Sequence, residues 1–98
     1  MIIIHALMQV DPAKREAFLA EAQHLLAATH AEEGNLSYEL YEHAGVSNSF
    51  IMVETWRDSA AVEAHNASSH FQAFAGKAGE FLSAPLDVKV YGAEPVSK

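Results

Sequence analysis

Two segments of the sequence predict strands that are apolar on both faces. In residues 2–10, alternation gives one wholly apolar face, and its opposite face carries Ile3, His5, Leu7 and Gln9. In residues 49–57, one face carries Phe50, Met52, Glu54 and Trp56, and the other carries Ile51, Val53 and Thr55. Successive side chains of a strand point to opposite faces, so strands of this kind need cover on both sides. The fold therefore has to bury two faces of the sheet that contains them.

The rest of the first half predicts a helix and a strand, and a further strand closes the chain. Asp11 followed by Pro12 is typical of a helix N-terminus, and we expect this first helix to end at Gly34. Residues 35–42 alternate in the manner of a strand, as do residues 86–91 near the end of the chain. Four strands are therefore expected, and the last three follow the first helix.

The segment between the last two strands predicts a helical region in two pieces. Asp58 is suited to cap a short helix that runs through His65. Ser69 and Gln72, three residues apart, fit a capping box at the start of a second helix, which Pro85 ends. The break between the two pieces lies between His65 and Ser69.

The predicted order βαββαβ is that of a ferredoxin-like α+β fold, an antiparallel four-stranded sheet with helices on one face. With 98 residues the chain is expected to form one domain, 1–98, in which residues 94–98 are a flexible tail. Because the helices cover only one face, a second copy of the sheet is the simplest cover for the other. We therefore expect a homodimer through the sheet faces, in the form of a dimeric α/β barrel.

The charge balance excludes several classes of partner. Thirteen acidic and six basic residues give a formal net charge of −7, which would repel a nucleic-acid backbone. No cysteine is present, so neither a disulfide nor a thiolate nucleophile is available.

The first ten residues lack a basic segment, and no apolar run reaches the roughly 18 residues of a membrane span. The sequence predicts a cytoplasmic protein without nucleic-acid or membrane partners.

No motif for a cofactor or a metal ion is present. The five glycines form no phosphate-binding loop, and the pattern HExxH is absent. Of the six histidines, no two stand three or four residues apart, the spacing that would build a metal site on one helix. The sequence therefore predicts neither a metal centre nor a cofactor.

Glu54 is the side chain that fits its predicted surroundings least. Its neighbours on the same strand face are Met52 and Trp56, and an unpaired buried carboxylate costs several kcal/mol. Glu54 must therefore be paired, protonated or hydrated. It is either a satisfied polar group, bonded to His5 or to a partner subunit, or the wall of a pocket.

The two histidines that follow are open to two interpretations each. His65 lies on the same helical stripe as small apolar residues, so it is either a helix-end histidine that packs on Trp56 or a group that exchanges a proton with a ligand. His70, in the first turn of the next helix, is expected at the surface. Asn35 fits a turn as well as a binding site.

Three stretches, EEGNLSYELYE, FIMVETWRD and VEAHNASSHFQAF, together resemble the antibiotic biosynthesis monooxygenase domain, in particular its small quinol-monooxygenase-like members. The resemblance extends over nearly the whole chain. It implies a dimeric α+β barrel and cofactor-free oxygenation of quinols or polycyclic phenols, in a pocket between sheet and helices. The residues that it marks are Asn35, Glu54, Trp56, His65 and His70.

The resemblance implies a small aromatic substrate and dioxygen as partners, and the residue types indicate roles. A base for a phenol works best with a pKa near 7, and histidine begins at roughly 6.5 whereas glutamate begins at ~4.3. His65 is therefore expected to be the base, and Glu54 to orient His65 or to hold a substrate hydroxyl. Trp56, Tyr38 and Phe50 are expected to form the aromatic wall.

Two alternatives remain open from the sequence. Isomerases of small phosphorylated quorum signals share the EEGN and Ala-His motifs. A non-catalytic dimer that binds a small hydrophobic ligand would use Glu54 and His65 as polar anchors.

Overall fold

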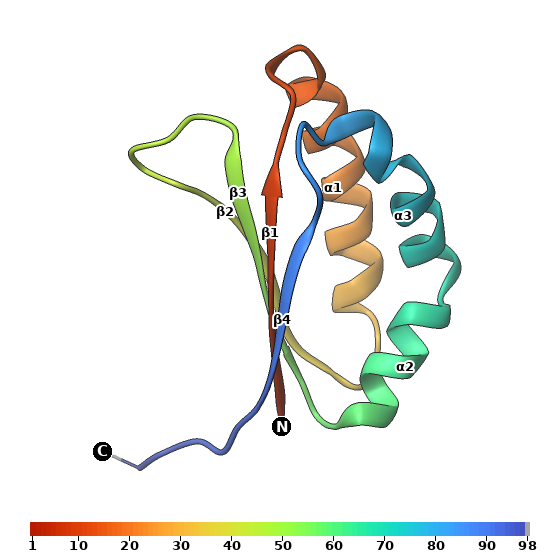
Figure 1. Ribbon diagram of the computed structural model, residues 1–98. Coiled ribbons are helices and arrows are strands. Elements are labelled where there is room, and N and C mark those ends of the chain that lie inside the picture. The colour runs from red at the N-terminus through yellow and green to blue at the C-terminus, as the bar shows by residue number, and fades with distance from the viewer. Residues whose placement is uncertain (98) are drawn as a thin grey trace.

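The computed structural model describes residues 1–97, which form one sheet with a layer of helices against it (Figure 1). In chain order the elements are β1 (Ile2–Gln9), the short 3-10 helix η1 (Pro12–Lys14), α1 (Arg15–His30), β2 (Asn35–Glu42), β3 (Ser49–Trp56), α2 (Ser59–Ala67), α3 (Ser69–Phe81) and β4 (Asp87–Gly92).

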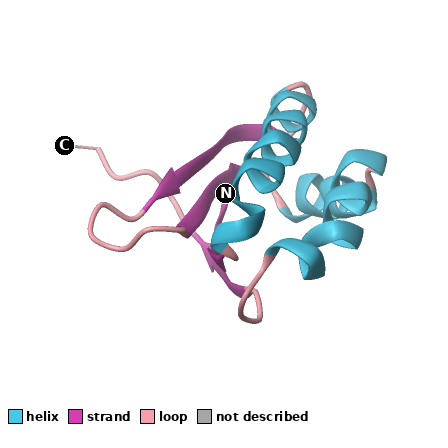
Figure 2. Cartoon of the chain, turned by 90° about the horizontal axis from the view of Figure 1, so that it is seen from above, coloured by secondary structure: helices cyan, strands magenta, loops and turns pink. Residues whose placement is uncertain are grey.

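The four strands pair antiparallel in the order β2-β3-β1-β4. All the helices lie on the same face of this sheet, which Figure 2 makes plain from above. The predicted ferredoxin-like α+β fold is therefore confirmed, and so is the division of the second helical region into two pieces. The strands that are apolar on both faces, β1 and β3, lie side by side in the middle of the sheet.

The face of the sheet under the helices carries the core. Ile4, Ala6 and Met8 of β1 are buried on this face, and the residues of β3 opposite them are at most 6% exposed. Phe18 and Leu25 of α1 and Phe81 of α3 pack onto them from above. Each large apolar side chain buried in this way contributes about 1.5–3 kcal/mol.

The opposite face of the sheet has no helix over it. Its centre is formed by half-exposed apolar side chains, with His5 between them, and these are Ile3, Leu7, Ile51 and Val53. Charged and aromatic groups of the outer strands form its rim. The second apolar face inferred from the sequence is therefore present, and its cover remains a prediction.

The helix caps agree with the sequence in part. The Asp11 side chain accepts from Ala13 N with Pro12 in the first helical position, although the turn that it caps is the 3-10 helix. Asp58 caps α2 as predicted, at 2.9 Å from Ala61 N. The expected cap at Ser69 is wrong by one residue, because the side chain that accepts from the first turn of α3 is that of Ser68.

Ser68 ends α2 and begins α3 at the same residue. Its backbone is extended (φ −68°, ψ 150°), its hydroxyl donates to the His65 carbonyl at 2.6 Å, and it also accepts from Phe71 N. A single extended residue between two helices makes the chain turn sharply. This turn brings the side chains of His65 and His70 toward the same point.

Gly34 does not end the first helix as expected, since α1 already ends at His30. Its φ is not positive either. Its role is close packing, because a Cβ at Gly34 would overlap the Cβ of Ala61 on α2. The absence of a side chain here therefore lets the loop after α1 lie directly against α2.

Within residues 1–97, no helix is long and apolar enough to cross a membrane. Residues 93–97 have no regular secondary structure. The expected flexible tail ends at residue 98, which lies outside the described residues, and its flexibility remains a prediction.

Candidate active site

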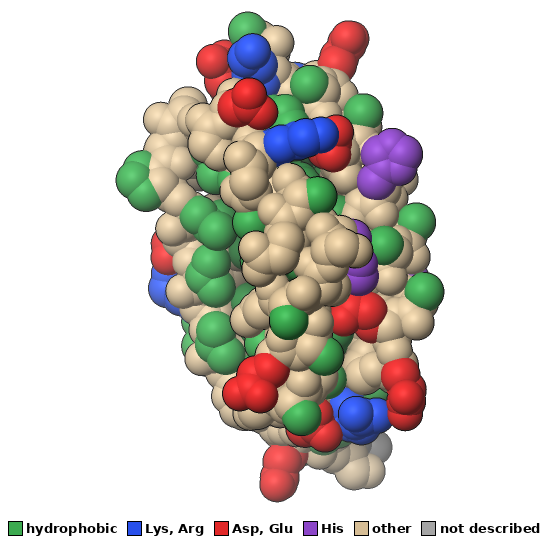
Figure 3. Space-filling model, turned by 90° about the vertical axis from the view of Figure 1, so that its right-hand side faces the viewer, with side chains coloured by type: hydrophobic (Ala, Val, Ile, Leu, Met, Phe, Trp, Pro, Cys, Tyr) green, Lys and Arg blue, Asp and Glu red, His purple; other side chains and the backbone are tan. Residues whose placement is uncertain are grey.

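A cavity of about 280 Å³ lies between the sheet and the helices α2 and α3. Its lining is mainly apolar, from β1 and β3 on one side and from α3 on the other, with a few polar groups. Leu86, just before β4, and Val88 and Val90 of β4 line it and are still 48%, 47% and 60% exposed. Figure 3 shows a row of hydrophobic side chains along the edge of the molecule, beside the helices. The cavity is therefore closed by the core at its base and open toward β4.

Glu54 lines this cavity and is 6% exposed. The register places it between Ile4 of β1 and Tyr38 of β2, on the face under the helices. Its Oε1 accepts from Trp56 Nε1 at 3.0 Å, and burial raises its pKa to about 7. The bond to His5 that was one alternative from the sequence is not formed, because His5 pairs with Val53 and so lies on the opposite face of the sheet.

His65 is 2% exposed and also lines the cavity. Its ring lies 4.7 Å from the Trp56 ring, 4.9 Å from Phe71 and 5.2 Å from Tyr38, measured between centroids. The packing of His65 on Trp56 considered from the sequence is therefore present. Burial lowers the pKa of His65, against the opposing effect of a carboxylate beside it.

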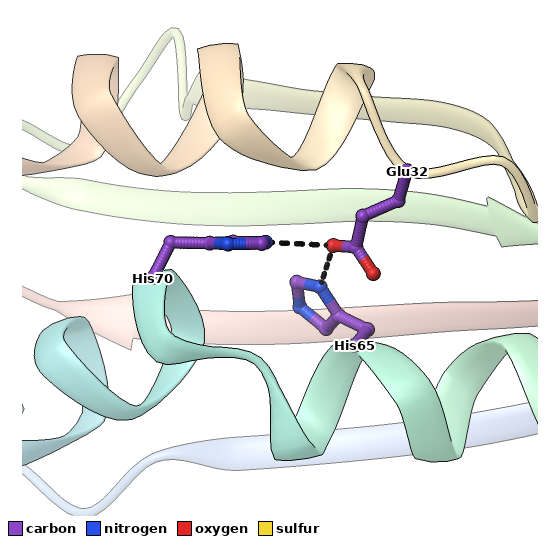
Figure 4. A group of neighbouring side chains, drawn as sticks. All are labelled: Glu32, His65 and His70. Carbon is purple, nitrogen blue, oxygen red and sulfur yellow. Dashed lines mark hydrogen bonds and ion pairs between the residues drawn. The ribbon is translucent and has the colours of Figure 1, made fainter.

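That carboxylate belongs to Glu32, which the sequence did not single out as a site residue. Its Oε2 lies 2.6 Å from Nδ1 of His65 and 2.8 Å from Nε2 of His70 (Figure 4). Glu32 follows α1 in the loop that Gly34 holds against α2. The EEGN motif was the available signal, but a loop has no periodicity that reveals where a side chain points. The residue bonded to His65 is thus Glu32, where the sequence suggested Glu54.

His70 was expected at the surface and is half-buried instead, with 24% of its side chain exposed. Its bond to Glu32 accounts for this position. His65 and His70 belong to different helices, which meet at Ser68. Their spacing of five residues in the sequence therefore does not predict that they share a hydrogen-bond partner.

The other predicted site residues divide between the cavity and its surroundings. Tyr38 lines the cavity at 2% exposure, and its burial raises the pKa of the phenol well above its ordinary value. Trp56 lies behind Glu54 and His65, bonded to one and packed on the other, and is not part of the lining.

Phe50 and Asn35 lie away from the cavity. The Phe50 ring packs 5.1 Å from Phe18, under the Arg15 guanidinium. The Asn35 amide donates to the carbonyls of Ser37 and Thr55, at 3.0 and 3.4 Å, and so bridges the irregularity where β2 begins. The expected contact of Phe50 and Asn35 with a substrate remains a prediction, and neither residue lines the cavity.

The bond between Glu32 and His65 fixes where the His65 proton lies. A carboxylate can only accept, so Nδ1 is the donor and the neutral ring leaves Nε2 with a free lone pair. Nε2 is buried and has no hydrogen-bond partner among the described residues. An imidazole held by a carboxylate, with an unpaired acceptor beside a cavity, is the arrangement of a general base.

The fold agrees with the comparisons to known proteins. The model of the family described as "Antibiotic biosynthesis monooxygenase" matches residues 1–77. The chain belongs to this family. The Bacillus subtilis protein named "Putative monooxygenase YcnE" is 52% identical over 90% of this chain and 93% of its own length.

A second relative has a solved structure. The Mycobacterium tuberculosis protein named "Putative monooxygenase Rv0793" is 33% identical over 81% of this chain and 77% of its own. Its structure superposes with a TM-score of 0.91 at 28% identity, over 99% of this chain and 98% of that one. The similarity covers the sheet and all three helices.

Proposed function

We propose that the protein is a monooxygenase that oxidises a quinol or small polycyclic phenol with dioxygen and needs no cofactor. The family and the names of its relatives support monooxygenase-like activity. The observation that carries the proposal is the buried, unpartnered Nε2 of His65 beside an apolar cavity.

In the proposed reaction His65 Nε2 accepts the proton of a substrate hydroxyl. The imidazolium that forms is stabilised by the Glu32 carboxylate at Nδ1. The resulting phenolate is a far better electron donor to dioxygen than the phenol. Dioxygen forms a bond to a ring carbon, and the O–O bond and the C–H bond at that carbon then break. One oxygen atom stays on the carbon as a carbonyl and the other leaves as water, which takes one proton from that carbon, with all four electrons supplied by the substrate. The proton held by His65 returns in forming that water.

Glu54 is proposed to hold a second polar group of the substrate. With a pKa raised to about 7, its carboxyl is partly protonated at neutral pH and can donate to a substrate oxygen or accept from a hydroxyl. The Trp56 N–H fixes one of its oxygens and so orients the other. Glu54 then positions the substrate while His65 moves the proton.

The cavity lining supports an aromatic substrate over a phosphorylated one. Among the described residues, no Lys or Arg lines the cavity, so a phosphate would have no cation to bind there. An apolar cavity of about 280 Å³, open along β4, suits a molecule of a few carbon rings at most. The isomerase considered from the sequence therefore has no supporting observation.

The open sheet face, with an apolar centre and a polar rim, supports a homodimer in which two such faces pack together. The net charge of −7 supports the absence of nucleic acid among the partners. A cytoplasmic location remains the prediction made from the sequence.

Oxygen consumption tests the proposed function. Purified protein is incubated in an oxygen electrode with a panel of hydroquinones, naphthohydroquinones and anthrone-like phenols, in the presence of a metal chelator. The proposal predicts catalysed uptake of one dioxygen per substrate with at least one member, and one atom of labelled dioxygen in the product. Uptake at the uncatalysed rate with every member, while a hydrophobic ligand binds tightly, would favour the ligand-binding alternative.

A further inference from the structure

We propose that Glu32, His65 and His70 form a binding site for a divalent transition-metal ion such as zinc, and that an ion bound there blocks His65 as a base. One carboxylate oxygen lies between two ring nitrogens, and the three atoms lie within 4.8 Å of one another. Figure 4 shows both rings directed at this oxygen. Two imidazoles and one carboxylate are a common ligand set for zinc and other first-row metals.

The distances fit a small rearrangement. Zinc ligands at about 2.0–2.2 Å in tetrahedral geometry lie about 3.4 Å from one another. The oxygen of Glu32 is 2.6 and 2.8 Å from the two nitrogens, so it has to retract by less than about 1 Å to admit an ion. The two nitrogens lie within 4.8 Å of each other, so they have to approach by up to about 1.4 Å. Glu32 belongs to a connecting loop, where such a shift disturbs neither a helix nor a strand.

The site is anchored on one side and open on the other. The His65 side chain is 3% exposed, whereas those of Glu32 and His70 are 16% and 24% exposed. An ion can therefore enter from the solvent side, and water can supply the remaining ligand. The net charge of −7 raises the local concentration of cations.

Metal binding changes which nitrogen of His65 carries the proton. In the metal-free protein the proton is on Nδ1, donated to Glu32. An ion on Nδ1 requires the neutral ring to carry its proton on Nε2 instead. Nε2 beside the cavity is then a donor and cannot accept a substrate proton. This consequence rests on the proposed function, whereas the metal site itself does not.

The only tryptophan of the chain reports on the site without any substrate. Trp56 lies 4.7 Å from the His65 ring. Added Co²⁺ is expected to quench its fluorescence, Zn²⁺ to reverse the quenching by competition, and calorimetry to give one Zn²⁺ per chain. His70→Ala and Glu32→Gln are expected to weaken binding at least about tenfold. His24→Ala, at an exposed position on α1, is the matched control and should bind as the wild type does.

The titration can overturn the proposal directly. Absence of saturable Zn²⁺ binding, or equal binding by wild type and His70→Ala, would remove the site. The blocking effect is tested by oxygen uptake, which Zn²⁺ should abolish with a midpoint at its dissociation constant; full activity at saturating Zn²⁺ would contradict it. Because the titration uses no substrate, its result stands even if the chain is not an oxygenase.

Discussion

At the scale of single residues, the hydrogen bond between Glu32 and His65 decides which group can act as base. Burial lowers the pKa of His65 and raises that of Glu54 to about 7, so the pKa values alone do not identify His65 as the base. The geometry does. Glu54 is already bonded to Trp56, whereas His65 has a free nitrogen beside the cavity and a carboxylate on its other nitrogen.

Glu32→Gln is expected to lower kcat on the order of 10²-fold, because the amide no longer stabilises the imidazolium and no longer fixes the proton on Nδ1. Steady-state oxygen uptake measures the change. Glu33→Gln makes the same chemical change at the adjacent residue, whose side chain is 94% exposed, and should leave kcat unchanged. Equal effects of both substitutions would show that Glu32 acts only through net charge.

Glu54 should make the stability of the fold depend on pH. Its pKa is raised from 4.5 to about 7 in the folded chain, so the folded state binds this proton more tightly than the unfolded one. The stabilisation is complete below pH 4.5 and is lost as pH rises through 7. The full change is about 3 kcal/mol in the free energy of unfolding.

Glu54→Gln isolates this contribution, since glutamine does not titrate and can still accept from Trp56. Urea unfolding at pH 4.5 and at pH 8 measures it. The variant should gain stability relative to the wild type as pH rises. A difference between the two proteins that stays constant over this range would mean that Glu54 is hydrated and keeps an ordinary pKa.

At the scale of elements, the site depends on how closely the loop after α1 approaches α2. Gly34→Ala places a Cβ against Ala61 and should push Glu32 away from His65. We expect a loss of about 1–3 kcal/mol in the free energy of unfolding and a fall in kcat as large as that of Glu32→Gln. Thermal unfolding and oxygen uptake measure the two effects.

Gly76→Ala is the control for this substitution. A Cβ at Gly76 meets nothing within 4 Å, and its position inside α3 favours alanine by about 0.5–1 kcal/mol. It should stabilise the fold slightly without lowering activity. If Gly34→Ala behaves in the same way, the close packing of loop and helix does not position Glu32.

The elements themselves could be predicted from the sequence because each carries its own period. Alternation identified the strands and placed Glu54 on the same face as Met52 and Trp56, and Asp58 marked the start of α2. Glu32 and His70 could not be placed in this way. Their positions depend on Gly34 fitting against Ala61 and on the turn at Ser68, which are contacts between elements. The position of Phe50 outside the cavity lining could not be predicted either, because the alternation assigns a residue to one face of a strand but does not show which side chains it meets along the strand.

At the scale of the whole molecule, the open sheet face predicts a dimer. Sedimentation should give twice the chain mass at micromolar concentration. Leu7→Glu places a charge among the half-exposed apolar residues in the middle of this face and should yield monomers. Gln23→Glu adds the same charge on the exposed surface of α1 and should leave the dimer intact. A wild-type chain that stays monomeric would contradict packing through the sheet faces.

His65→Ala tests most directly whether His65 accepts the substrate proton in an oxygenation that uses no cofactor. Oxygen uptake by chelator-treated wild type and variant is compared on the best quinol of the panel, with far-ultraviolet circular dichroism to verify that both are folded. We expect a fall in kcat on the order of 10²-fold or more in the variant. A folded His65→Ala protein that consumes dioxygen at the wild-type rate would contradict it.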